Sequence, residues 1–392
     1  MADFKYLIVG GGMTADAAVR GIRTADKNGR IGIVSEENHP PYNRPPLSKS
    51  LWKGEPLDSI WRRTPEKNLD FMAGRSVVRI EPSLRRVHER GGASHTYEKL
   101  LLATGGRPRR LAQDPGGVLY FRTLDDYTAL RQLCRDGGSF AVIGSGFIGS
   151  EIAAALSMNG QSVTMILPQE TIGARVYPPP LGKFLNGYFR EKGVTLLTGE
   201  SVLGVERDGG KYALRTSSGA EIEVDGVVAG LGIEPNTGLA ASAGLRVENG
   251  ISVDEFLRTS DPDVFAAGDV AGFFSPSLSR RVRVEHEDNA NMMGETAGKN
   301  MAGGSVPYTH MPSFYSDLFD LGYEAVGDLD AELETVSDWK EEFREGVVYY
   351  MKEDRVRGVL LWNTWGKLDA ARALIAQNAP LARKDLLGLI RS

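Results

Sequence analysis

Two glycine-rich turns are the residues of this sequence whose types and spacing most directly suggest chemistry. Each follows an apolar run and carries small residues at three set positions: Gly10, Gly12 and Ala15 in the first turn, and Gly144, Gly146 and Gly149 in the second. Glycine at such positions lets the backbone approach a pyrophosphate, whose charge then meets the N-terminus of the following helix. One copy is weak evidence, because glycine turns before helices are common. Two copies favour two dinucleotide sites.

Carboxylates that could bind ribose hydroxyls follow the second strand of each repeat. Glu36 comes after the apolar run 31–34, where such an acid is expected. In the second repeat Leu167 occupies the usual position, and Glu170 is the nearest acid, although a solvated loop residue is an equal alternative. No arginine pair stands there to bind a 2′-phosphate. The sequence therefore favours NADH and does not exclude NADPH.

A third signal is Asp269, which follows Gly268 at the end of another apolar run. An aspartate on a glycine turn can hydrogen-bond a ribityl hydroxyl beside a flavin, whereas a lone turn aspartate more often caps the next segment. Thr104 and Gly105 end the apolar run 100–103 in a similar small-residue turn. Together with the two glycine turns, these residues favour a flavin.

The elements that must position these turns follow an α/β order. Strand, glycine turn, helix and strand occur at residues 6–34 and again at 139–167, which predicts two doubly wound, Rossmann-like dinucleotide-binding domains. Towards the C-terminus, residues 346–351 and 357–362 are typical of antiparallel strands, and residues 368–390 are helical in pattern. These segments predict a small C-terminal α+β domain.

At 392 residues, the chain is too long for a single hydrophobic core. We expect a first domain that is split by insertion of the second. The expected boundaries are 1–112 and 236–304 for the FAD-binding domain, 113–235 for the NAD(P)H-binding domain, and 305–392 for the C-terminal domain.

Composition excludes several classes of function. The net charge of −5 gives no reason to expect nucleic acid or an anionic membrane as a partner. Phe140–Met158, the most apolar long stretch, contains Glu151 and glycine interruptions, so no membrane span is expected. Cys134 is the single cysteine, which fits a reducing cytoplasm. There is no signal-peptide pattern at the N-terminus, and no metal site is predicted.

The sequence motifs, and the order in which they occur, resemble those of the flavin-dependent pyridine-nucleotide reductases. They comprise the two turns, the string Ala-Thr-Gly-Gly-Arg-Pro-Arg at 103–109 and Ala-Gly-Asp at 267–269. Pro41-Tyr-Asn-Arg-Pro-Pro-Leu-Ser-Lys49 closely resembles the apoptosis-inducing factor branch, which is related to the ferredoxin reductases of bacterial oxygenase systems. The resemblance covers nearly the whole chain, and further strings carry it at 284–290, 313–317 and 322–324.

The resemblance implies a role for each of a set of residues. The residues expected to contact FAD are Glu36, Arg44 and Val77 at the adenosine end, Thr104, Gly105, Arg122 and Asp269 along its length, and Lys49, Glu285, His286 and Tyr315 near the ring. The residues expected on the NAD side are Phe147, which gates the nicotinamide, and Glu170, Gly232, Glu324 and Asn363. Lys49 is expected to pair with Glu151, and with His286 they form the expected catalytic set. As alternatives, Lys49 is a solvated lysine, His286 is structural and Tyr315 is plain core.

The sequence also differs at several positions from the families that it resembles. Disulfide reductases carry a redox-active cysteine pair where this sequence has residues 43–49 without cysteine, so electrons cannot pass through a dithiol. Glu287 and Tyr315 stand where close relatives often carry another His or Trp and a Trp, respectively.

Two hypotheses of function follow. In the first, an NADH-dependent reductase passes electrons to a [2Fe–2S] ferredoxin, rubredoxin, quinone or dioxygen. The arginines of 107–110 and 280–283 would dock an acidic iron–sulfur carrier, or are ordinary exposed arginines. In the second, an apoptosis-inducing-factor-like flavoprotein responds to redox state, and its NADH charge-transfer complex controls conformation or homodimerisation.

Overall fold

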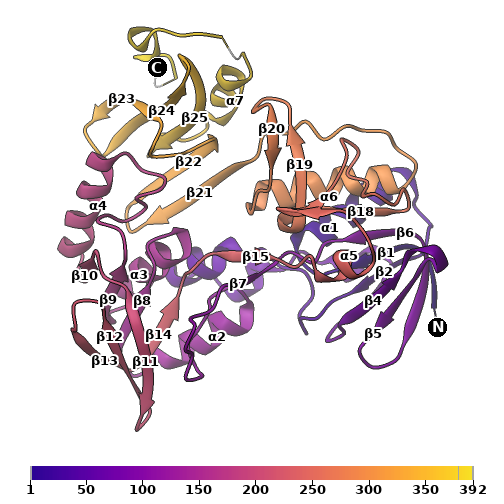
Figure 1. The fold of residues 1–392 in the computed structure, drawn as a ribbon, viewed down its shortest axis with the longest axis horizontal. Coiled ribbons are helices and arrows are strands. Elements are labelled where there is room, and N and C mark those ends of the chain that lie inside the picture. The colour runs from indigo at the N-terminus through magenta and orange to yellow at the C-terminus, as the bar shows by residue number, and fades with distance from the viewer. Residues whose placement is uncertain (1, 378, 391–392) are drawn as a thin grey trace. The chain divides into compact units, whose positions relative to one another are not determined.

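A computed structural model describes residues 2–377 and 379–390, and its chain divides into two compact units (Figure 1). Unit 1 comprises the residues up to Arg44, Leu57–Arg107 and Glu234–Ser313. Unit 2 comprises Pro45–Pro56, Pro108–Ile233 and the residues from Phe314 onward. Pro45–Pro56 is thus grouped apart from the rest of the segment that we assigned to the FAD-binding domain. The three-domain boundaries themselves stay a prediction.

A seven-stranded sheet forms the centre of unit 1, in the order β3–β2–β1–β6–β5–β4 with β18 also paired to β6. Its strands are β1 (Ala2–Val9), β2 (Ile31–Val34), β3 (Asp70–Met72), β4 (Val77–Glu81), β5 (Arg86–Glu89), β6 (Ser94–Leu102) and β18 (Val264–Ala266). β3, β2, β1, β6 and β18 run parallel, whereas β5 and β4 are antiparallel additions. Parallel strands are covered on both faces, which explains the continuous apolar runs at the centre of this sheet.

Helices α1 (Met13–Ala25) and α6 (Glu287–Met301) lie against each other in unit 1. Their backbones approach closely because glycines stand at the contact: a methyl group at Gly298 would lie 2.1 Å from the carbonyl oxygen of Ala18. The remaining elements of unit 1 are α5 (Gly238–Ser242) and a second sheet of β16 (Val247–Glu248), β17 (Gly250–Ser252), β19 (Ala271–Ser275) and β20 (Arg280–Val282). β7 (Gly106–Pro108) and β15 (Ile233–Pro235) carry the chain from one unit to the other.

Unit 2 contains a second parallel sheet in the order β10–β9–β8–β14. Its strands and the helices that accompany them are α2 (Leu124–Leu133), β8 (Ser139–Ile143), α3 (Phe147–Met158), β9 (Ser162–Leu167), α4 (Pro179–Glu191), β10 (Val194–Thr198) and β14 (Gly226–Ala229). A three-stranded antiparallel sheet is inserted before β14, formed by β11 (Val202–Asp208), β12 (Lys211–Thr216) and β13 (Glu221–Val224).

The C-terminal part of unit 2 is a five-stranded sheet in the order β21–β22–β25–β24–β23. Its strands are β21 (Ser313–Leu318), β22 (Leu321–Gly327), β23 (Glu334–Glu341), β24 (Glu345–Lys352) and β25 (Arg355–Trp362). α7 (Leu368–Gln377) packs against β22 and β25. The predicted fold class, two Rossmann-like sheets followed by an α+β segment, is confirmed.

The C-terminal helix is shorter than the sequence predicts. The helical pattern predicted over 368–390 is too long, since α7 ends at Gln377 and the helical structure at the described residues 379–390 is limited to a 3₁₀ turn, Arg383–Leu386. Pro380 explains the difference, because proline cannot continue a helix and disfavours it at the preceding residue.

In the part of the chain that the structure describes, no helix is long and apolar enough to cross a membrane.

Candidate active site

The first glycine turn, in unit 1, combines one glycine that the fold requires with one that faces open space. Gly10 has φ +115°, and a methyl group there would lie 2.1 Å from the carbonyl oxygen of Ala103, which follows β6. Gly12 precedes α1, and the nearest atom to a methyl group there is Nη2 of Arg44, at 4.0 Å. The backbone of Gly12 therefore has room for a pyrophosphate at the positive end of α1.

The second glycine turn, in unit 2, repeats this geometry. Gly144 has φ +103°, and a methyl group there would lie 2.5 Å from the carbonyl oxygen of Gly230, which follows β14. Gly149 packs its Cα against the turn, with a methyl group only 2.1 Å from the carbonyl oxygen of Gly144. Gly146 caps α3 and has no atom within 4 Å of the methyl position. The residues present thus fit a dinucleotide at each turn.

Arg44 lies beside the first turn and is held by Glu37. Its guanidinium forms an ion pair with the Glu37 carboxylate, which also accepts a 2.6 Å hydrogen bond from the Tyr42 hydroxyl. Burial opposes the charge of Arg44, but Glu37, Tyr42 and Asp269 together outweigh this effect and raise the arginine pKa above its usual value. Glu36 is exposed and accepts a hydrogen bond from Ser76, so it remains accessible to a ribose.

Asp269 follows β18 on the turn that the sequence predicted, and Arg283 fixes that turn. Arg283 Nη1 donates to the backbone carbonyl of Asp269 at 3.0 Å and forms an ion pair with Glu285 at 2.6 Å. Its Nε also donates to the Asn249 side chain at 3.0 Å. The sequence predicts Arg283 as part of a docking surface, but only 11% of its side chain is exposed. The structure therefore gives Arg283 a positioning role.

Thr104 and Gly105 are held by Asn236, a residue that sequence reasoning missed. The Thr104 hydroxyl donates to the Asn236 carbonyl at 2.9 Å, and the Asn236 amide donates to the Thr104 carbonyl at 2.8 Å. The backbone amide of Asn236 also donates to the Gly105 carbonyl at 2.9 Å. Val77 lies on β4 and packs against the main core cluster of unit 1.

His286 stands at the N-cap of α6. Burial lowers the pKa of its imidazole to about 4, although Asp269 and Asp288 act in the opposite direction. At neutral pH the ring is therefore uncharged, and it can donate or accept a hydrogen bond but cannot supply a positive charge.

This lowered pKa predicts a pH dependence of stability. Between pH 6.5 and about 4 the unfolded chain binds a proton at His286 that the folded chain does not bind, so the free energy of unfolding should fall as the pH falls. Urea unfolding of the FAD-saturated protein at pH 7 and pH 5 measures this loss. His286→Gln should show a smaller loss than the parent protein. An equal loss in both proteins would contradict the neutral imidazole.

A buried ionic cluster surrounds Glu151 in unit 2. Lys49 Nζ lies 2.7 Å from Glu151 Oε2, so the two residues are paired in the structure. The Ser48 hydroxyl donates to the same oxygen at 2.6 Å, and the Ser316 hydroxyl donates to Oε1 at 2.6 Å. Only 9% of the Lys49 side chain and 2% of the Glu151 side chain are exposed. Both carboxylate oxygens therefore have partners, which a buried charge requires.

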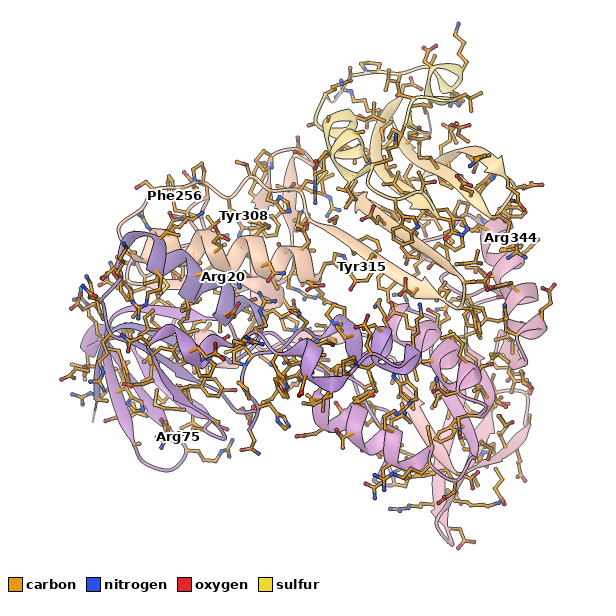
Figure 2. All side chains as sticks on the ribbon, turned by 180° about the vertical axis from the view of Figure 1, so that it is seen from behind. Arg20, Arg75, Phe256, Tyr308, Tyr315 and Arg344 are labelled. Carbon is orange, nitrogen blue, oxygen red and sulfur yellow. The ribbon has the colours of Figure 1, made fainter. Side chains whose placement is uncertain are left out.

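Aromatic rings border this cluster. Lys49 Nζ lies 5.2 Å from the centre of the Tyr315 ring, within cation–π range. Tyr315, labelled in Figure 2, is on β21 and is 40% exposed, so it is not plain core. Phe147, the first residue of α3, packs its ring against Phe314 with the centroids 5.1 Å apart. Lys49 itself is not a solvated lysine.

Other predicted residues of unit 2 have contacts of their own. Asn363 ties the end of β25 to Gly322, whose amide donates to the Asn363 side chain at 2.7 Å. Glu324 accepts a 3.1 Å hydrogen bond from the Gly366 amide. Gly232 has φ +83° and Glu170 is exposed. Arg122 precedes α2, with its backbone amide donating to Asp126 at 3.0 Å. None of these contacts tests a role in binding NAD or FAD.

Two glycine turns of matching geometry, each at the N-terminus of a helix that follows a parallel strand, define a protein that binds two dinucleotides. The chain belongs to the pyridine nucleotide-disulphide oxidoreductase family, whose model matches residues 4–294. Residues 297–340 and 337–377 match the mitochondrion-associated C-terminal domain of apoptosis-inducing factor. The protein is thus an FAD-dependent NAD(P)H oxidoreductase.

Relatives of two kinds cover nearly the whole chain. It is 33% identical to apoptosis-inducing factor 1, mitochondrial, of Dictyostelium discoideum, over 95% of this chain and 78% of that protein. It is 34% identical to the 5,5'-dehydrodivanillate O-demethylase ferredoxin reductase subunit of Sphingobium sp., over 98% of this chain and 96% of that protein.

Solved structures support the same family. The covalent putidaredoxin reductase–putidaredoxin complex contains a chain that is 32% identical, with a TM-score of 0.91 over 98% of this chain and 96% of that chain. The ferredoxin reductase for the CYP199A2 system of Rhodopseudomonas palustris is 29% identical, with a TM-score of 0.90 over 99% of this chain and 97% of that chain. The predicted family is confirmed.

Proposed function

We propose that this protein takes a hydride from a reduced pyridine nucleotide and delivers the electrons to a small iron–sulfur protein. The observation that carries this proposal is the lack of a thiol pair. Cys134 is the single cysteine of the chain, and burial raises the pKa of its thiol to about 11, which makes it unreactive. Electrons therefore have no dithiol to pass through, and an external acceptor must take them.

Named relatives support the iron–sulfur acceptor. Two are a ferredoxin reductase subunit and, at 31% identity, a putidaredoxin reductase. A similar chain has also been solved in complex with putidaredoxin. NADH as the preferred donor rests only on the lack of an arginine pair after β9.

The chain's own residues would bind and orient the reactants. In this proposal Gly12, Arg44 and Asp269 bind FAD, Gly146 binds the pyridine nucleotide, and Lys49 provides a fixed positive charge. When bound, FAD supplies hydride acceptance at N5 and release of electrons one at a time. Glu151 acts through Lys49, because the carboxylate fixes the position of the ammonium group.

The structure limits which arginines are available for docking an acidic carrier. Arg283 is mostly buried, and Arg281 Nη2 donates to the carbonyl oxygens of Val253 and Gly272, so the fold already engages both guanidinium groups. Arg107 and Arg110 are exposed over 74% and 70% of their side chains. We propose these two as the cations that meet the carrier.

This docking proposal predicts a selective loss of activity. Arg107→Ala with Arg110→Ala should raise the KM for a [2Fe–2S] ferredoxin by roughly threefold to tenfold at low salt, because steering charges are lost. Ferricyanide reduction by the same variant should stay unchanged and serves as the control. An unchanged KM would contradict docking at these arginines. If the parent protein reduces none of several ferredoxins, the proposal that its acceptor is an iron–sulfur protein is contradicted.

A second candidate function rests on the match to the C-terminal domain of apoptosis-inducing factor. Here a long-lived, NADH-bound reduced protein would change its conformation or form a homodimer, and turnover would be slow. Gel filtration with and without NADH under anaerobic conditions distinguishes the two candidates. We also propose a cytoplasmic location, on the ground of the single cysteine.

A further inference from the structure

The loop after β9 folds back onto the second glycine turn. The amide of Gly173 donates to the carbonyl oxygen of Ser145 at 3.0 Å. The Ser145 hydroxyl donates to Oε1 of Gln169 at 3.2 Å. Ser145 stands between Gly144 and Gly146, so the side chain of Gln169 reaches the turn itself.

Glu170, the acid that the sequence favours as the ribose ligand, has its contacts at α4 and at the end of β10. Its backbone carbonyl accepts a 2.8 Å hydrogen bond from the Asn186 side chain on α4. Its carboxylate oxygen Oε1 would lie 3.3 Å from a methyl group on Gly199, the residue that follows β10. The Glu170 side chain is therefore turned towards the end of β10, and it is exposed.

We propose that Gln169, and not Glu170, contacts the adenosine ribose of the pyridine nucleotide, and that this neutral side chain lets the protein accept NADPH as well as NADH. The inference rests on the proposed function, because it takes the second turn as the site of the pyridine nucleotide. It also revises the preference for NADH that the sequence alone suggested.

The chemistry of the amide supports this assignment. A carboxylate at this point of a dinucleotide fold accepts hydrogen bonds from the ribose hydroxyls and repels a 2′-phosphate. Gln169 has no charge, and its Oε1 is already bonded to Ser145, so its Nε2 group supplies donors. An amide donor suits a ribose oxygen and a phosphate oxygen alike.

The test compares two variants in the full-length, FAD-loaded protein. The value of kcat/KM for NADH and NADPH is measured with ferricyanide as acceptor. Calorimetry with AMP and adenosine 2′,5′-bisphosphate measures ribose recognition without any redox step. The variants are Gln169→Glu and, as the matched control in the same loop, Glu170→Gln.

The parent protein should use the two nucleotides with kcat/KM values within about tenfold of each other. Gln169→Glu should weaken NADPH and the bisphosphate by roughly tenfold or more, because a carboxylate then faces a phosphate, while NADH and AMP change little. Glu170→Gln should leave every value within about twofold, since its side chain is turned away.

Several results would overturn the inference. They are rejection of NADPH by the parent protein, an unchanged nucleotide preference in Gln169→Glu, or a changed preference in Glu170→Gln. If the protein oxidises no NADH at all, the proposed function itself is contradicted. In that case the binding of the two adenosine phosphates would still decide whether Gln169 reads the ribose.

Discussion

Gly12→Ala is expected to leave the protein folded but unable to retain FAD. The nearest atom to the added methyl group is 4.0 Å away, and φ is −90°, so the chain itself tolerates alanine. The methyl group would occupy the space that the pyrophosphate needs at the N-terminus of α1. We expect FAD affinity to fall on the order of a hundredfold, or about 2.7 kcal/mol. Flavin fluorescence titration measures the affinity, and circular dichroism checks the fold.

Two matched glycine variants serve as controls for this result. Gly10→Ala should fail to fold, because its methyl group would lie 2.1 Å from the Ala103 carbonyl oxygen and φ is +115°. Gly146→Ala, in the second turn, should fold, because nothing lies within 4 Å of its methyl position. It should keep FAD but lose affinity for NADH, because the methyl group would occupy the space that the pyrophosphate of NADH needs. Normal FAD binding by Gly12→Ala would show that the first turn is not the flavin site.

Glu151→Ala should cause a large loss of stability. It would leave the ammonium group of Lys49 buried without its counter-ion, and would also leave the Ser48 and Ser316 hydroxyls without their acceptor. Breaking one side of a buried ion pair costs about 3–5 kcal/mol. The measurement is the free energy of unfolding in urea, with FAD in excess.

The double variant Lys49→Met with Glu151→Leu provides the control. It removes both charges, so most of the lost stability should return. The same double variant should still reduce flavin more slowly than the parent protein if Lys49 acts on the cofactor. Stability of Glu151→Ala within about 1 kcal/mol of the parent, a usual surface value, would show that the pair is solvated in solution.

The parts of this molecule that could be read from the sequence are those encoded by neighbouring residues. The glycine turns and the strands β24 and β25 depend on local spacing, and each lies where it was predicted. The helical pattern at 368–390 continues past the end of α7, because the spacing of apolar residues does not show the helix break at Pro380. Local patterns therefore predicted the sheets and turns better than the ends of helices.

The parts that could not be read depend on residues far apart in the chain. Ser48 and Ser316 bond to Glu151 across separations of 103 and 165 residues, and no spacing rule connects them. Arg283 was assigned to a charged surface because an arginine's burial is not visible in its neighbours. The choice between Gln169 and Glu170 likewise needs the direction of each side chain, which depends on how the loop folds.

An anaerobic titration of the FAD-reconstituted protein with NADH, followed by visible absorption, tests directly whether this protein is an FAD-dependent NADH oxidoreductase. We expect tight retention of FAD and bleaching of its absorption by about one equivalent of NADH. A long-wavelength band that persists would favour the redox-responsive function, and its absence would favour the turnover reductase. A protein that retains no FAD, or whose flavin stays oxidised with excess NADH and NADPH, would not be an FAD-dependent NAD(P)H oxidoreductase.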